Sequence, residues 1–178
     1  MMPFLAAESD ATFAMARILW NFYYTIMTHP SLTPGTLSTC RPNTMPWVDW
    51  AMPGAQFKLL HADASSGQFT LLIKFEAGAA APIHRHVGAV QGYMLEGSFH
   101  YKDDPDTRFD AGSYLYENEG AVHQPVSPDG GVMFAVFHGP VEGLDEAGNV
   151  IGRIHWKWHV EKWNAAGNHY VPTGLPPA

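Results

Sequence analysis

The central part of the chain, from residue 57 to residue 137, consists of short apolar runs separated by turn residues. Within the runs, apolar side chains alternate with polar ones or follow one another for about four to eight positions, which is typical of strands. The runs are FKLLHAD, QFTLLIKFEAG, GYMLEGSFHY, RFDAGSYLYENEG, HQPVSP and GGVMFAVFHG. Because no helical pattern lies between them, these segments predict an antiparallel β-sandwich or a small β-barrel.

The chain before these strands has a different pattern. Large apolar side chains between Phe13 and Met27 recur every three to four residues, which predicts an amphipathic helix that packs on the domain or on a partner subunit. Glu8 and Arg17 interrupt the apolar stretch, so it predicts neither a secretion signal nor a membrane span. Met27 is an alternative start of the protein. Residues 31–53 are rich in proline, serine and threonine and predict an irregular arm.

The last segment, IHWKWHVEKWNAAGNHYVP, fits two elements. Alternate residues are apolar at its start, as in a strand, whereas Trp156, Val160 and Trp163 follow the i, i+4, i+7 spacing of a helix. The sequence Asn164-Ala-Ala-Gly is typical of a helix end, so we favour a short helix that ends near Gly167.

Composition narrows the class of protein. Apolar residues make up 46% and charged residues 15% of the 178 residues, as in a single globular domain. We therefore expect an all-β, single-domain protein with a helix and arm at residues 1–53 and a β-barrel with a C-terminal helix at residues 54–178. The formal net charge of −7, without any cluster of basic residues, argues against a nucleic-acid partner. The single cysteine, Cys40, cannot form an internal disulfide, which agrees with a cytoplasmic location.

Two histidines one residue apart are the strongest chemical signal. His84 and His86 lie in a strand pattern, so both side chains project from the same face and can share one metal ion. A third ligand would come from a neighbouring strand, and His123, just after a glycine-containing turn, is the best candidate. The alternative is that these histidines bind no metal and are simply exposed or hydrogen-bonded.

The spacing of glycines around these histidines resembles the two motifs of the cupin superfamily. GAAAPIHRHVGAVQGYMLEG at residues 78–97 resembles the first motif, and GSYLYENEGAVH at residues 112–123 resembles the second. The first motif carries Gln91 instead of the usual glutamate, and the second carries Asn118 instead of the usual proline. The resemblance implies a cupin β-barrel, or jelly roll, and these departures concern a fourth metal ligand.

The same two segments are similar to cupin dioxygenases that cleave carbon–carbon bonds in diketones and hydroxyketones. Trp47 and Trp50, in the pattern W-x-x-W, make the chain most similar to the 2,4′-dihydroxyacetophenone dioxygenase family. This resemblance implies a non-haem Fe(II) ion held by His84, His86 and His123. It also implies a homodimer or homotetramer that uses O₂ to split an aromatic α-hydroxyketone, 2,4′-dihydroxyacetophenone, into 4-hydroxybenzoate and formate.

Two other functions stay open. The motifs fit cleavage of acetylacetone-type diketones equally well, and zinc-binding cupin domains of anti-sigma sensor proteins share the first motif without being enzymes. Three histidines bind zinc or nickel at least as well as Fe(II), so the sequence does not select the metal.

Three further residues are candidates for catalysis. A glutamine at position 91 would leave a coordination position open for substrate, and Gln91 would then orient an imidazole or a water; alternatively it satisfies a buried polar contact. Glu117 lies six residues before His123 and would accept the proton released on enolisation, unless it is a surface residue. Tyr93 shares the strand face of Gln91 and would donate to a substrate oxygen or pack in the core.

The remaining candidates have structural explanations. Arg85, between the two motif histidines, should face away from the metal. His155 and His159 have the i, i+4 spacing of a helical metal pair, but the tryptophans around them predict a packed terminal element. Apolar residues expected to line a pocket for an aryl ketone are Met94, Leu95, Phe99, Met133, Phe134 and Phe137.

Overall fold

The structure is a computed structural model that describes residues 39–174. The amphipathic segment between Phe13 and Met27, and the alternative start at Met27, lie outside the described residues.

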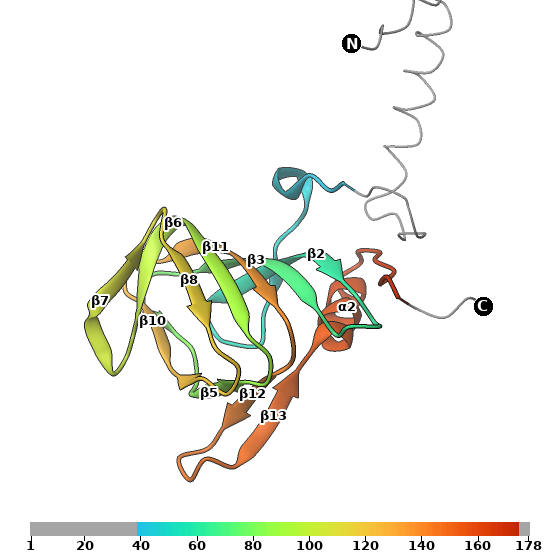
Figure 1. The fold of residues 1–178 in the computed structure, drawn as a ribbon. Coiled ribbons are helices and arrows are strands. Elements are labelled where there is room, and N and C mark those ends of the chain that lie inside the picture. Colours follow the sequence, from blue (N-terminus) through green and yellow to red (C-terminus); the bar gives the residue numbers. More distant parts are fainter. Residues whose placement is uncertain (1–38, 175–178) are drawn as a thin grey trace, which may run out of the picture.

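The described chain is almost entirely β-structure, with one short helix at its C-terminal end (Figure 1). All of the paired strands run antiparallel, and the sheets curl toward each other to form a barrel. The elements in chain order are η1 (Pro42–Thr44), β1 (Val48–Asp49), β2 (Ala55–Ala62), β3 (Phe69–Phe75), β4 (Ala79–Ala80), β5 (His84–His86), β6 (Val90–Tyr101), β7 (Asp104–Asp110), β8 (Tyr114–Glu117), β9 (Val122–His123), β10 (Pro125–Ser127), β11 (Gly131–Phe137), β12 (Val141–Leu144), β13 (Val150–Ile154) and α2 (Trp156–Ala165). The predicted antiparallel barrel of the cupin type is confirmed.

The strands form two sheets. The larger has nine strands in the order β1-β2-β3-β11-β6-β10-β4, and β7 and β8 also pair with the long strand β6. The smaller has four strands in the order β13-β12-β5-β9. Both strands that carry the motif histidines, β5 and β9, are neighbours in this smaller sheet, which therefore positions the candidate site.

Apolar side chains at alternate positions along the strands of the larger sheet form the core. Phe57 and Leu59 in β2, and Phe69 and Leu71 in β3, are fully buried and point into the barrel. Phe69 stacks on Phe137 of β11 with a centroid separation of 4.6 Å. Burial of such side chains stabilises the fold by about 1.5–3 kcal/mol each, so the core fixes the sheet against which the smaller sheet packs.

A close approach of two strand ends requires glycine at position 97. A Cβ atom at Gly97 would lie 2.0 Å from the carbonyl oxygen of Gly130, and the φ angle of Gly97 is +66°. Any larger residue would clash with the backbone where β6 meets β11. This explains why the first motif ends on a glycine.

The C-terminal part of the chain contains a predicted and an unpredicted element. Helix α2 ends at Ala165, with Gly167 at φ +83° beyond it, which confirms the expected helix and its end. The hairpin formed by β12 and β13 was not predicted; it projects from the barrel in Figure 1. Among the described residues no helix is long and apolar enough to cross a membrane.

The packed part of the chain begins before the expected domain boundary at residue 53. Met45 and Val48 are buried in the main core, and β1 pairs with β2. Trp47 lies over the ammonium group of Lys58, 4.3 Å from the ring centroid, on the outer face of the sheet. The final residues of the arm therefore belong structurally to the barrel.

Candidate metal centre

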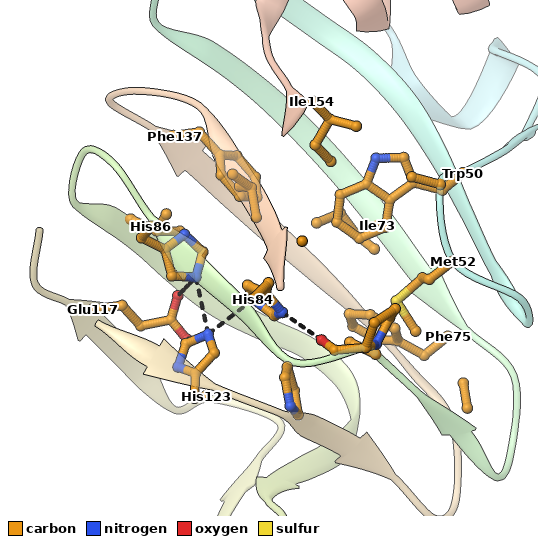
Figure 2. A pocket seen from close by; sticks show the side chains of 18 of the residues that line it. Trp50, Met52, Ile73, Phe75, His84, His86, Glu117, His123, Phe137 and Ile154 are labelled. Carbon is orange, nitrogen blue, oxygen red and sulfur yellow. Dashed lines mark hydrogen bonds and ion pairs between the residues drawn. The ribbon is translucent and has the colours of Figure 1, made fainter. Parts of the chain in front are cut away.

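Three histidine side chains meet at one point inside the barrel. The register of β5 and β9 places His84 directly opposite His123, and His86 follows two residues later on the same face of β5. The Nε2 atom of His123 lies 2.9 Å from Nε2 of His86 and 3.0 Å from Nε2 of His84 (Figure 2). The structure thus brings together all three residues that were predicted as metal ligands.

A tight turn in the second motif brings β9 against β5. Gly120 has a φ of +82° and donates its backbone N–H to the carbonyl oxygen of His86 at 2.8 Å. The N–H of His86 in turn donates to the carbonyl oxygen of Ala121 at 3.0 Å. Because these bonds tie the turn to the histidine strand, the position of His123 is set by the backbone rather than by its own side chain.

The ring nitrogen of His84 that faces the other two histidines carries a lone pair. Nδ1 of His84 lies 2.9 Å from the carbonyl oxygen of Pro82, which can only accept, so the proton of this ring is on Nδ1 and Nε2 is free to bind a metal. Burial lowers the pKa of His84 and lowers the pKa of His123 to about 4. Both rings are therefore neutral near pH 7, which is the form that binds transition metals.

The donor set fits a divalent transition-metal ion. One ring nitrogen of each histidine lies within 4.8 Å of the others. Uncharged imidazoles gain little from facing one another, whereas a cation between them would bind all three lone pairs. Nitrogen donors of this kind suit iron, zinc, copper and nickel.

Glu117 adds a negative charge at the centre. Its Oε2 lies 3.1 Å from Nε2 of His86, and its Oε1 lies 3.6 Å from Nε2 of His123. Burial alone would raise the pKa of Glu117, but the hydrogen bond with His86, the electrostatic interactions with His123 and His86, and a hydrogen bond from Tyr101 outweigh it and lower the pKa. The carboxylate is therefore ionised near pH 7 and can accept a proton or assist metal binding.

Tyr101 holds Glu117 and His123 and was not predicted. Its hydroxyl donates to Oε1 of Glu117 at 2.6 Å, and its ring stacks on His123 with centroids 4.7 Å apart and planes at 17°. Burial and the adjacent carboxylate raise the pKa of Tyr101 well above its ordinary value, so it stays a hydrogen-bond donor. A sequence signal did exist, because Tyr101 lies two residues after the predicted lining residue Phe99.

Strand β6 presents Val90, not Gln91, to the histidines. Val90 is 1% exposed, lies opposite Glu117 in the strand register and lines the same cavity. Gln91 lies opposite Tyr116, which is 55% exposed, and its amide contacts His138 at 2.9 Å on the outer face. The expected contact of Gln91 with the centre is therefore corrected: the two residues share a strand but face opposite sides.

The other residues predicted to line the pocket also lie on one or the other face of their strand. Tyr93 is 44% exposed and, with Leu95 and Phe134, belongs to the outer face rather than to the cavity. Phe99, Met133 and Phe137 line the cavity as predicted, whereas Met94 is buried in the core. Residues that share the face of Gln91 thus point outward.

The cavity beside the histidines is almost entirely apolar. It has a volume of about 330 Å³. Beyond the histidines and Glu117, its walls come mainly from the arm, β3, the segment after β4 and the β12–β13 hairpin. Lining residues that the sequence did not identify include Trp50, Met52, Ile73, Phe75, Val141 and Ile154.

Arg85 points away from the histidines, as predicted. Its guanidinium pairs with Glu142 on β12, which is 2% exposed and also pairs with Arg153 of β13. The two hydrogen-bonded guanidinium groups lower the pKa of Glu142. This ion-pair group ties the hairpin to the histidine strand.

His155 and His159 do not form a metal site. Nδ1 of His155 accepts a hydrogen bond from the backbone N–H of Lys157 at the start of α2. His159 is fully buried, and both of its ring nitrogens have hydrogen-bond partners, Trp50 and the carbonyl oxygen of His155. The expectation of a packed terminal element agrees with these contacts.

Comparisons with known proteins agree with this fold. Residues 36–142 match the family described as the ChrR cupin-like domain. An acetylacetone-cleaving enzyme from Acinetobacter johnsonii is 27% identical over 120 residues, which cover 65% of this chain and 78% of that protein.

Solved structures share the same barrel. An RmlC-like cupin protein from Ralstonia eutropha JMP134 superposes with a TM-score of 0.67 at 28% identity, covering 76% of this chain and 87% of the other. The crystal structure of an acetylacetone dioxygenase from Acinetobacter johnsonii superposes with a TM-score of 0.66 at 24% identity, covering 76% of this chain and 95% of the other. The second likeness, at this identity, concerns the fold alone.

Proposed function

The chain belongs to the ChrR cupin-like domain family, and from this premise we propose that it is a non-haem Fe(II) dioxygenase that cleaves an aromatic α-hydroxyketone. The substrate in this proposal is 2,4′-dihydroxyacetophenone. The observation that carries the proposal is a three-histidine centre with an adjacent ionised carboxylate, open to a cavity that is otherwise apolar.

His84, His86 and His123 would hold the metal through their Nε2 atoms. When bound, the divalent ion would polarise the ketone oxygens and bring the ketone and O₂ together. Fe(II) is chosen over zinc because zinc has no redox chemistry with which to use O₂. Val90 supports this assignment, because an apolar side chain at the position that faces the histidines leaves room for substrate.

Glu117 would act as the proton acceptor. An α-hydroxyketone must lose a proton to become an enolate, and the Glu117 carboxylate is ionised and lies beside the atoms that would hold the metal. Tyr101 would orient this carboxylate by its 2.6 Å hydrogen bond. A positioned base of this kind typically contributes a factor of about 10² to 10⁴ in rate.

The apolar cavity supports an aryl group on the substrate. Phe75, Ile73 and Met52 offer carbon surface and no charge, so they favour a neutral ring over a charged or strongly hydrated group. The walls also exclude water from the oxygenated substrate.

The proposed reaction balances. One molecule of ketone and one of O₂ give 4-hydroxybenzoate and formate: the bond between the carbonyl carbon and the hydroxymethyl carbon breaks, the O–O bond breaks, and each fragment gains one oxygen atom. The protein should be loaded with Fe(II) and ketone without oxygen and then exposed to ¹⁸O₂. We expect one labelled oxygen in each product by mass spectrometry. Label in one product alone, after correction for exchange with water, would exclude a dioxygenase.

The relatives support a second candidate, cleavage of an acetylacetone-type diketone. One relative is an acetylacetone-cleaving enzyme. Oxygen consumption measured with acetylacetone and with 2,4′-dihydroxyacetophenone on the same iron-loaded preparation separates the two candidates by their kcat/KM values. No oxygen consumption with any ketone, together with tight zinc binding, would favour a third candidate, a non-catalytic zinc-binding sensor domain.

A homodimer or homotetramer in the cytoplasm remains part of the proposal. Leu72, Phe134, Tyr93 and Tyr114 lie opposite one another in successive strands and form an uncharged row across the outer face of the larger sheet. Solvent-facing sides of antiparallel sheets are usually polar. Because the chain carries a net charge of −7, an uncharged face is the one best suited to meet a second copy. Light scattering on the eluted protein tests this, and a monomer would contradict it.

A further inference from the structure

We propose that Trp50 sets the preference of the cavity for aryl substrates and that His159 is the positioning residue that fixes the Trp50 indole. The inference rests on the proposed function only for the class of ligand. It connects helix α2, which contributes no lining residue, to the substrate cavity.

Trp50 forms part of the cavity wall away from the metal centre. Figure 2 shows its indole on the opposite side of the cavity from His86, Glu117 and His123, with the ring nitrogen on the edge turned away from them. An aryl ketone bound at the histidines is longer than a small diketone, so its ring is the group better able to cross the cavity to this wall. Trp50 is therefore placed to contact the part of the substrate that does not react.

The indole N–H is bound outside the cavity. Nε1 of Trp50 donates to Nε2 of His159 at 2.9 Å. Because an indole N–H can only donate, Nε2 of His159 must be unprotonated, and its proton is on Nδ1, which donates to the carbonyl oxygen of His155 at 2.8 Å. Both nitrogens of His159 and the single N–H of Trp50 therefore have hydrogen-bond partners.

His159 itself cannot turn. It is 0% exposed, and it stacks on Phe69 of β3 with ring centroids 4.4 Å apart. Phe57 of β2 meets it edge to face at 5.4 Å. The imidazole is thus clamped between the helix and the larger sheet, so the acceptor that holds Trp50 has a fixed position.

Two consequences follow for the cavity wall. With its N–H satisfied by His159, Trp50 presents only aromatic carbon surface to a ligand. Without that acceptor, a partly buried N–H would have to find another partner, which favours a different indole rotamer. Removal of the His159 acceptor should therefore weaken contacts with an aryl ring and leave binding at the metal end unchanged.

The test compares two ligands and two substitutions of one residue. Anaerobic, zinc-loaded protein is titrated with 2,4′-dihydroxyacetophenone and with acetylacetone by calorimetry. His159→Leu removes the acceptor; His159→Gln retains an acceptor for the indole. We expect His159→Leu to raise the Kd of the aryl ketone about fivefold, the size of a lost aromatic contact. The Kd of acetylacetone should stay within about twofold, and His159→Gln should resemble the wild type for both ligands.

A second background distinguishes positioning from general damage. Trp50→Phe keeps an aromatic ring but removes the N–H, so His159→Leu should cause no further change in selectivity in that background. Equal weakening of both ligands by His159→Leu, or the same selectivity change with and without Trp50, would overturn the proposal, as would a failure of either ligand to bind the wild type. If no ketone is oxidised but the selective change in Kd is found, the enzyme assignment fails and the Trp50–His159 inference stands.

Discussion

The three histidines of the candidate metal centre and the single buried His159 illustrate how similar side chains acquire different roles. At the metal centre, His84, His86 and His123 turn their Nε2 atoms toward one point. On helix α2, His159 is fully buried, and both of its nitrogens already have hydrogen-bond partners. Burial lowers the pKa of His123 to about 4 and that of His159 to about 3.

The difference that matters for metal binding lies in the ring nitrogens that remain without a backbone or indole partner. His84 donates through Nδ1 to Pro82 and keeps Nε2 free, whereas the corresponding Nε2 of His159 is occupied by the indole of Trp50. A neutral imidazole is therefore a candidate ligand only when one of its ring nitrogens accepts no hydrogen bond, so that its lone pair is free to bind a metal. The following experiments test this distinction.

The largest effect is expected on metal binding. His84→Ala, His86→Ala and His123→Ala should each lower metal affinity by more than about 100-fold, because even the loss of an outer hydrogen bond to a ligand costs up to about that factor. His159→Gln, at the other buried histidine, should keep the full metal content. Metal analysis and circular dichroism on the four purified variants give the comparison. Full occupancy in any alanine variant would remove that residue from the ligand set.

The carboxylate is the second difference between the two groups. Glu117→Gln keeps the shape and the hydrogen bond with Tyr101 but removes the proton acceptor, so kcat should fall by about 100-fold with normal metal content. Tyr101→Phe, the matched change in its partner, should have a smaller effect because the carboxylate remains. Equal kcat values for Glu117→Gln and wild type would show that Glu117 has no part in proton transfer.

The strands, the convergence of His84, His86 and His123 and the outward direction of Arg85 could be predicted from the sequence, since they follow from a period of two and from motif spacing. That period also placed Gln91 and Tyr93 on one face of β6. The period itself does not tell which face is inside. The face of Val90, Gly92 and Met94 is the more apolar one, but the cupin motif, which usually has glutamate at position 91, directed the expectation to the opposite face. Only the pairing of β6 with β8 and β11 decides this.

Contacts between segments that are distant along the chain could not be predicted from the sequence. Trp50 and His159 are 109 residues apart, and no spacing relates them. Glu142 likewise joins Arg85 to the unpredicted hairpin through a tertiary ion pair. Such contacts depend on how the elements pack, whereas periodicity reports only on each element separately.

The two faces of β6 can be compared directly by adding a carboxylate to each. Val90→Glu would direct an acid at the histidines and compete with the ketone or O₂ for the metal, so turnover should fall about tenfold or more. Gln91→Glu, one residue away, should leave turnover within about twofold because its side chain lies outside the barrel. Iron content and kcat of both variants decide the matter. Equal inhibition by the two changes would mean that the register of β6 differs from the one described.

The smallest effect concerns acid stability and separates His159 from the metal centre. In the unfolded chain this imidazole binds a proton near its ordinary pKa of 6.5. In the folded state, burial outweighs the raising effect of the hydrogen bond to the His155 carbonyl and lowers the pKa to about 3. Between these values the unfolded chain binds more protons, so the stability that depends on neutral His159 is present above pH 6.5 and decreases as the pH falls. From about pH 7 to about pH 5.5 this amounts to about 1 kcal/mol.

His159→Gln removes this titration and keeps a hydrogen-bond acceptor for Trp50. In denaturant unfolding of metal-free protein at the two pH values, the variant should therefore lose about 1 kcal/mol less than the wild type. All titratable groups other than residue 159 are common to both proteins, so their contribution cancels in the difference. The neighbours of His159 from the packed elements, Phe57, Phe69, Trp50 and Trp158, do not titrate, and His155 is common to both proteins. Identical losses would mean that the folded protein admits a proton at His159, and that its two hydrogen bonds do not hold the ring neutral.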